Sequence, residues 1–84
     1  MIKSKKYFVY IVECADGTLY TGITTDLSRR VAEHNTGPVG AKYTSARRPV
    51  TLVYSKRYKD RSSASVEEAR IKKLSKAGKL ALIG

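Results

Sequence analysis

The sequence predicts a small α+β domain, a three-stranded antiparallel sheet flanked by helices in the order ββαβα. Three runs rich in aromatic and β-branched residues, at 7–14, 18–24 and 50–58, alternate with two helix-like stretches. The 84 residues make one domain, 1–84, without repeats or a linker. Strands and helices of these lengths pack most simply as helices on an antiparallel sheet.

The first two runs indicate a β-hairpin around a turn signal at residues 15–17. A two-residue turn would put Tyr10 and Tyr20 on opposite faces of the sheet. A three-residue turn with a left-handed Gly17 would put both tyrosines on one face and Gly22 opposite Tyr10. In that register the bare glycine would leave room for a backbone or a phosphate. The residues alone leave both registers open.

The first helix, capped by residue 25 or 26, is predicted to run to about residue 35. Its apolar face is marked by the spacing of Leu27, Val31 and His34. Arg30 lies at the edge of that face, opposite the solvated pair of Arg29 and Glu33. An arginine and a histidine on the inner side need partners, because unpaired buried charge is costly. Alternatively, Arg30 extends past the core edge and His34 is a satisfied buried imidazole.

The third strand is predicted over 50–58, with Val50, Leu52 and Tyr54 alternating. The second helix is predicted from about Ser65 to Lys76, broken near Gly78 and followed by an apolar tail.

Glu68 sits at the margin of the apolar face of this second helix. Ser65-x-x-Glu68 matches a capping box, in which Glu68 reaches back to the Ser65 backbone. A surface pair between Glu68 and Lys72 is the other structural interpretation.

Charge is the strongest compositional signal, because the formal net charge is +10. Residues 42–84 carry twelve basic and three acidic residues, whereas residues 1–41 carry five and four. Such a basic half favours a polyanionic partner, most simply a nucleic acid. A solubility surface or binding to anionic membranes would also fit.

Other composition excludes several classes. The single cysteine, Cys14, forms no internal disulfide and fits a reducing compartment. One Cys and one His cannot build a structural zinc site. No apolar run of about 18 residues occurs, so no membrane span is expected. We therefore expect a cytoplasmic protein.

The same residues resemble the GIY-YIG nuclease motif. Phe8-Val9-Tyr10 and Tyr20-Thr21-Gly22 match its two strand segments, and Leu27, Arg30 and His34 follow at matching intervals. Glu68 falls where the family places its metal ligand. The resemblance covers nearly the whole chain. It is strongest to small single-domain bacterial and archaeal proteins and to the nuclease domain of the eukaryotic subunit that resolves branched DNA. Ile23 stands where many members have a lysine after the motif glycine.

The resemblance implies a metal-dependent DNA endonuclease that hydrolyses phosphodiester bonds of nicked, branched or damaged DNA, with a role in DNA repair. One Mg²⁺ or Mn²⁺ would be held by Glu68. Arg30 would hold the scissile phosphate. Tyr10 or Tyr20 would position or deprotonate the attacking water, with His34 as the alternative proton acceptor.

The connection between the first helix and the third strand is basic and is expected to follow the DNA backbone. The expected substrate-binding residues are Gly22, Lys42, Tyr43, Arg47 and Arg48. Two other functions fit the same sequence: a DNA-binding module without turnover, and a subunit that is active only with a protein partner.

Overall fold

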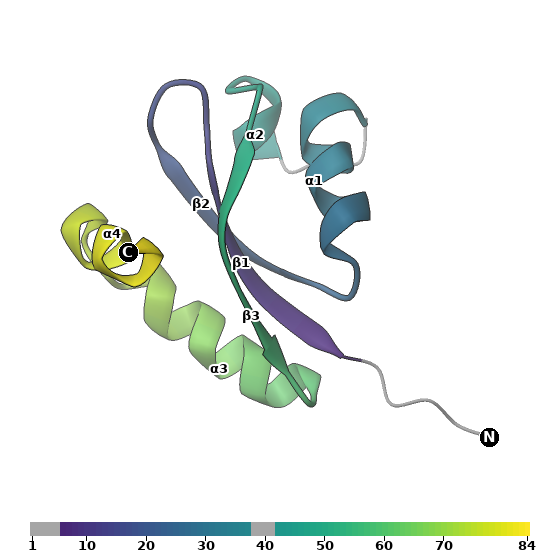
Figure 1. Ribbon diagram of the computed structural model, residues 1–84, viewed down its shortest axis with the longest axis vertical. Coiled ribbons are helices and arrows are strands. Elements are labelled where there is room, and N and C mark those ends of the chain that lie inside the picture. Colours follow the sequence, from purple (N-terminus) through teal and green to yellow (C-terminus); the bar gives the residue numbers. More distant parts are fainter. Residues whose placement is uncertain (1–5, 38–41) are drawn as a thin grey trace.

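The computed structural model describes residues 6–37 and 42–84, except for the side chains of Lys42 and Tyr43. Three antiparallel strands, β1 (Tyr7–Glu13), β2 (Leu19–Thr24) and β3 (Thr51–Tyr58), form one sheet with β1 in the centre. Helix α1 (Leu27–Thr36) and the one-turn α2 (Lys42–Ser45) lie on one side of the sheet (Figure 1). Helices α3 (Arg61–Lys72) and α4 (Lys76–Ile83) lie on the other side. The predicted α+β architecture is confirmed.

The β1–β2 hairpin adopts the register of the three-residue turn. The amide of Cys14 donates to the carbonyl of Thr18 at 2.8 Å, and Gly17 has a φ of 84°. Glycine takes this left-handed conformation without the clash that a Cβ would cause. Tyr10 therefore pairs with Gly22, and both motif tyrosines point to the α1 side of the sheet.

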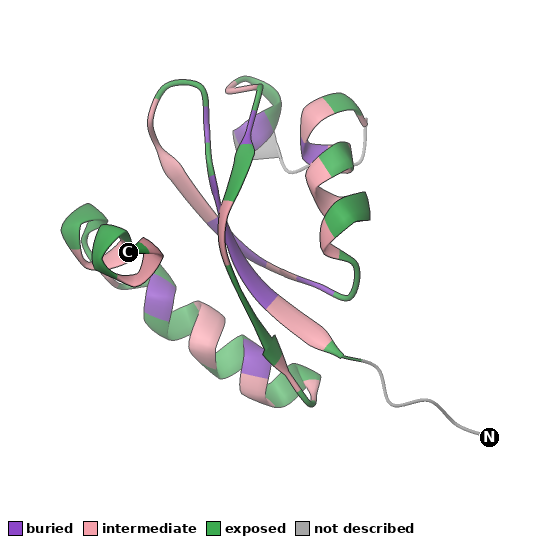
Figure 2. Cartoon of the chain, in the orientation of Figure 1, coloured by how far each residue is buried: buried purple, intermediate pink, exposed green. Residues whose placement is uncertain are grey.

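Strand β1 contributes to two separate cores, because its side chains alternate between the faces of the sheet. Toward α3 and α4, the buried cluster consists of Val9, Ile11, Ala64 and Ile71. Toward α1, it consists of Tyr10, Val12, Cys14 and Val50, with Leu27 and Val31 packed against it. Figure 2 shows this burial concentrated in the central strand. The α1-side core is the one that contains a motif tyrosine.

The simple alternation predicted for the third strand is wrong, because β3 contains a bulge. Ile11 pairs with Tyr54 but Val12 pairs with Leu52, which leaves Val53 as the extra residue. Val53 and Tyr54 consequently both pack toward α3, and Leu52 stays 37% exposed.

The predicted start of the second helix is also wrong, and with it the capping box. Helix α3 begins at Arg61, and the carboxylate of Asp60 caps it by accepting the Ser63 amide at 2.7 Å. Ser65 therefore lies inside the helix. Ala64, one residue before the predicted start, is already helical and fully buried in the core between α3 and the sheet. Glu68 instead forms the surface pair, 3.2 Å from Nζ of Lys72.

The helix was predicted to break near Gly78, but the break occurs earlier in the sequence, between Lys72 at the end of α3 and Lys76 at the start of α4. The hydroxyl of Ser75 accepts the Gly78 amide at 3.2 Å and starts α4, so Gly78 is helical. The expected apolar tail is thus a helix whose end packs on the α3-side core. Across the described residues, every helix is too short or too polar for a membrane crossing.

Candidate active site

His34 is the centre of a buried polar chain on the α1 side of the sheet. Its side chain is completely buried. Nε2 lies 2.8 Å from the hydroxyl oxygen of Tyr10, and Nδ1 lies 2.7 Å from the hydroxyl oxygen of Thr44. A neutral imidazole has one donor and one acceptor, and the two hydroxyls satisfy both. The helical spacing correctly predicted that His34 faces inward with a partner.

The surroundings of His34 favour the uncharged form of its imidazole. Burial lowers the pKa of His34, and the nearby positive charge of Arg30 lowers it further. A neutral imidazole has a free lone pair on one nitrogen, so His34 can take a proton from a hydroxyl that contacts it.

Tyr10 is 1% exposed and remains a protonated phenol in this environment. Burial raises the pKa of Tyr10, and the neighbouring Arg30 guanidinium opposes that effect. Tyr20 approaches the same imidazole, with its ring centroid 5.4 Å from that of His34, in an edge-to-face arrangement. The Tyr10 ring meets it in the same way at 5.8 Å. The structure therefore brings both motif tyrosines to His34.

The space over Gly22, which we expected to be open to a phosphate, is filled by Tyr10. A Cβ added at Gly22 would lie 2.5 Å from the Tyr10 hydroxyl oxygen. The motif glycine thus makes room for the tyrosine ring on the neighbouring strand. Its contribution to the site is to let Tyr10 reach His34.

Arg30 connects this buried pair to the surface. Its guanidinium interacts with the Tyr10 hydroxyl and lies 3.0 Å from the Glu33 carboxylate. Arg29 lies 3.7 Å from the other carboxylate oxygen of Glu33, so Glu33 bridges two arginines. The sequence predicted instead that Glu33 pairs with Arg29 alone on the solvated face of α1.

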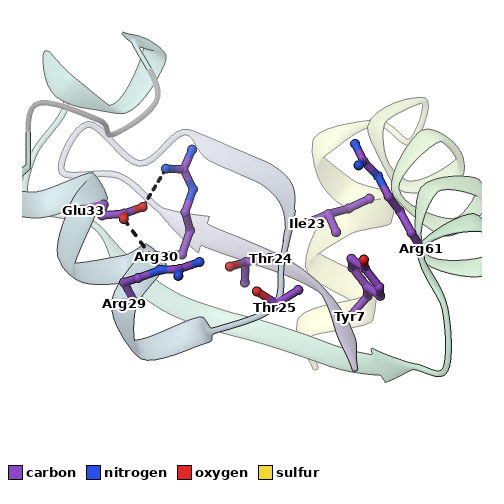
Figure 3. A pocket seen from close by; sticks show the side chains of 8 residues that line it. All are labelled: Tyr7, Ile23, Thr24, Thr25, Arg29, Arg30, Glu33 and Arg61. Carbon is purple, nitrogen blue, oxygen red and sulfur yellow. Dashed lines mark hydrogen bonds and ion pairs between the residues drawn. The ribbon is translucent and has the colours of Figure 1, made fainter. Parts of the chain in front are cut away.

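Arg30 also lines a surface depression of about 340 Å³ beside the end of β2 (Figure 3). The lining residues are Tyr7, Ile23, Thr24, Thr25, Arg29, Arg30, Glu33 and Arg61.

Glu68 comes from α3, on the other face of the sheet. Its side chain is 24% exposed, and its negative charge still raises the pKa of Tyr10. No group of three or more His, Cys, Asp or Glu side chains gathers within the residues that the structure describes. A cation at Glu68 would therefore have fewer than three ligands of these types from the described residues and would complete its shell with water and substrate oxygens. This donor set suits Mg²⁺ or Mn²⁺, which retain waters and prefer oxygen.

Contacts from α1 hold the segment that carries Thr44. Arg48 Nε donates to the carbonyl of His34 at 2.6 Å, and Arg48 Nη2 donates to the carbonyl of Gly37 at 2.7 Å. The Asn35 side chain donates to the Val50 carbonyl at 3.1 Å and accepts its amide at 2.7 Å. These contacts fix the connection between α2 and β3 against the end of α1. Thr44 and Asn35 were missed from the sequence, where they look like ordinary polar residues near a loop.

Arg47 also contacts the protein itself. Its Nε lies 3.1 Å from the Asp16 carboxylate, and its carbonyl accepts the Ala15 amide at 2.9 Å. The expected DNA contacts of Arg47 and Arg48 remain predictions, and both side chains already have partners in the fold. The side chains of Lys42 and Tyr43, expected to bind substrate, lie outside the described residues.

Comparison with known proteins extends the resemblance over almost the whole chain. The family model described as the GIY-YIG catalytic domain matches residues 6–81. A UPF0213 protein of Desulfotalea psychrophila is 58% identical over 92% of this chain and 70% of its own length. A UPF0213 protein of Halobacterium salinarum is 57% identical over 90% of this chain and 97% of its own length.

A solved structure has the same fold. The solution NMR structure of a UPF0213 protein from Bacillus halodurans aligns with a TM-score of 0.60 at 41% identity. The alignment covers 93% of this chain and 82% of that one.

Proposed function

This chain belongs to the GIY-YIG catalytic domain family, and from that premise we propose that it is a metal-dependent DNA endonuclease. It hydrolyses phosphodiester bonds, and its substrates are nicked, branched or damaged DNA. The observation that carries the proposal is the buried contact of the Tyr10 hydroxyl with the neutral His34, beside Arg30. This contact supplies a proton acceptor next to the guanidinium of Arg30, a group suited to binding phosphate.

Arg30 holds the scissile phosphate in the proposed mechanism. Its guanidinium is permanently charged and offers paired donors that match two phosphate oxygens. Its side chain is 24% exposed and lines the surface depression, so it can meet a substrate while contacting Tyr10. The positive charge also offsets the negative charge that develops on the phosphoryl oxygens in the transition state.

Tyr10 and His34 move the proton of the attacking water. The Tyr10 hydroxyl is closed to solvent, so the water has to approach it from the side of Arg30, whose guanidinium contacts the same oxygen. The Tyr10 oxygen accepts the proton of this water as its own hydroxyl proton passes to Nε2 of His34. In this mechanism Nδ1–H of His34 donates to the hydroxyl of Thr44, so that Nε2 carries the free lone pair. Because the pKa of His34 is lowered, the acceptor is neutral and ready at neutral pH.

Glu68 is the residue proposed to hold the divalent ion. The ion, when bound, supplies positive charge to the phosphate and to the leaving oxygen. Its helix lies on the other face of the sheet, but the charge of this half-buried carboxylate raises the pKa of Tyr10, which supports the proposed role. The pair with Lys72 on the next helical turn has to yield or shift when the ion binds.

A DNA-binding module without turnover is the second candidate. Ile23 replaces a lysine that many family members have, and burial keeps the pKa of Tyr10 above its ordinary value. Both features weaken the base, while the positive charge of the chain would still bind DNA.

One digestion experiment separates the two functions. Plasmid, single-stranded and branched DNA are incubated with the protein in EDTA, Mg²⁺ or Mn²⁺. We expect cleavage that requires the metal and is strongest on a branched or nicked form. If the protein binds every DNA form but cleaves none, it is a DNA-binding module without turnover. If cleavage appears only after a captured protein partner is added, the protein is a partner-dependent nuclease subunit.

A further inference from the structure

The depression beside β2 is larger than one phosphate contact requires. Its volume of about 340 Å³ falls within the range of about 300–1,000 Å³ that is typical of ligand sites. Arg30 occupies one wall with Arg29 and Glu33, and Arg61 stands on the opposite side across the end of β2 (Figure 3). The mechanism uses Arg30 alone, which leaves the other two arginines without an assigned task.

Arg61 is available for a ligand. It is the first residue of α3 and is exposed. Within the described part of the chain its guanidinium forms no ion pair, although its neighbour Asp60 is acidic, because the Asp60 carboxylate is used as the helix cap. Thr24 and Thr25 also line the depression. The Thr24 hydroxyl already donates to the Asp26 carbonyl at 3.2 Å, so the Thr25 hydroxyl is the neutral donor of this pair.

We propose that this depression is a second phosphate subsite, in which Arg61 and Arg29 bind the backbone phosphate next to the scissile one. The proposal rests on the proposed function, because the scissile phosphate is the one that Arg30 holds there. A nucleic-acid strand crossing the end of β2 would meet Arg61 on one side and Arg30 on the other. Two fixed contacts on consecutive phosphates set which bond lies at Tyr10, so the subsite positions the strand for cleavage.

Glu33 acts as the resident anion of this subsite. Its carboxylate lies 3.7 Å from Arg29 and 3.0 Å from Arg30, so it occupies one arginine of each of the two phosphate contacts. Substrate therefore has to displace this carboxylate or share the arginines with it. Removing its charge should strengthen DNA binding, the opposite of removing Arg61.

The test measures binding of a short labelled duplex in EDTA, where no cleavage occurs. We expect Arg61→Gln to weaken binding about tenfold, the scale of one charge-assisted hydrogen bond, and to reduce the salt slope by about one contact. Glu33→Gln should tighten binding several-fold. Arg57→Gln is the matched control, because Arg57 is an exposed arginine without an ion pair among the described residues, on the edge strand β3.

Neutral methylphosphonates placed singly along the strand identify the contact. In the wild type, one position should weaken binding as much as Arg61→Gln does, and in Arg61→Gln that position should no longer matter. Equal losses from Arg57→Gln and Arg61→Gln, or a methylphosphonate pattern unchanged by Arg61→Gln, would overturn the subsite while leaving the proposed function intact. If no duplex binds even at low salt, both fail.

Discussion

The hydroxyl oxygen of Tyr10 lies 2.8 Å from Nε2 of His34, at a place that is closed to solvent. Tyr10 comes from the central strand and His34 from the last turn of α1, 24 residues away. Gly22 on the neighbouring strand provides the space for this contact, and Thr44 holds the other nitrogen of His34.

Replacing Gly22 by Ala should separate Tyr10 from His34. The new methyl group would sit 2.5 Å from the Tyr10 oxygen, so the ring has to move. We expect a stability loss of about 1–3 kcal/mol from overpacking, and a much larger loss of cleavage than of DNA binding. Gly78→Ala is the control, because its methyl group meets the side chain of Leu74 on the other face of the sheet. Unchanged cleavage by a folded Gly22→Ala protein would contradict the proposed role of the contact.

His34 should make stability depend on pH in a defined window. Its ordinary pKa of 6.5 applies to the unfolded chain, and burial lowers it in the fold. The unfolded state therefore binds the proton more readily, so stability is complete above pH 6.5 and falls as the pH drops toward the folded value. The pKa of the Glu67 carboxylate is lowered from 4.5, so the stability that this group contributes is lost only in more acidic solution.

Chemical denaturation as a function of pH tests this assignment. His34→Gln should remove the slope just below pH 6.5 and leave the acidic slope in place. The acidic limb of cleavage should also lie below pH 6.5 in the wild type. An unchanged stability slope in His34→Gln would assign the effect to other groups.

Arg47 and Arg48 should differ in stability although they are neighbours. Arg48→Ala removes hydrogen bonds to the carbonyls at the end of α1, and we expect a loss of about 1.5–3 kcal/mol. Arg47→Ala removes the partly exposed ion pair with Asp16, a kind of pair worth about 0–1 kcal/mol. Urea unfolding of both variants measures the difference. If Arg48→Ala is as stable as the wild type but binds DNA less tightly, Arg48 is mainly a DNA contact, as the sequence suggested.

Replacing Glu68 by Gln should separate the metal site from helix stability. The Glu68–Lys72 pair is a surface pair on one helix, so its loss should cost about 0.3–0.5 kcal/mol. Metal-dependent cleavage should fall by about two orders of magnitude or more, while DNA binding in EDTA is retained or tightened. Thermal unfolding and cleavage are measured on the same preparation. Wild-type cleavage by Glu68→Gln would exclude Glu68 as the metal ligand.

The residues predicted the fold and much of the site because periodicity places side chains on faces. The spacing of Leu27, Val31 and His34 correctly put the histidine inward, and the turn at residues 15–17 offered the register that brings Tyr10 and Tyr20 together. The sequence could not choose between the two registers, because a left-handed glycine at position 17 is compatible with both the two-residue and the three-residue turn.

The errors came from contacts between distant segments. Ser65 and Glu68 have the spacing of a capping box, but Asp60 caps the helix, which begins at Arg61 and packs Ala64 against the sheet. The bulge at Val53 arises from pairing with β1, which no pattern within β3 reveals. Thr44 lies ten residues after its hydrogen-bond partner His34, and a threonine in a basic loop carries no sequence signal for an imidazole partner.

The most direct measurement is DNA cleavage by Tyr10→Phe beside the wild type and Tyr20→Phe, with Mn²⁺ or Mg²⁺. Phenylalanine keeps the ring over Gly22 and removes the hydroxyl that meets His34. We expect wild-type cleavage that needs the metal, a loss of about two orders of magnitude or more in Tyr10→Phe, and unchanged DNA binding in both variants. Equal cleavage by Tyr10→Phe and the wild type, or no cleavage of any DNA form by the wild type, would contradict the account.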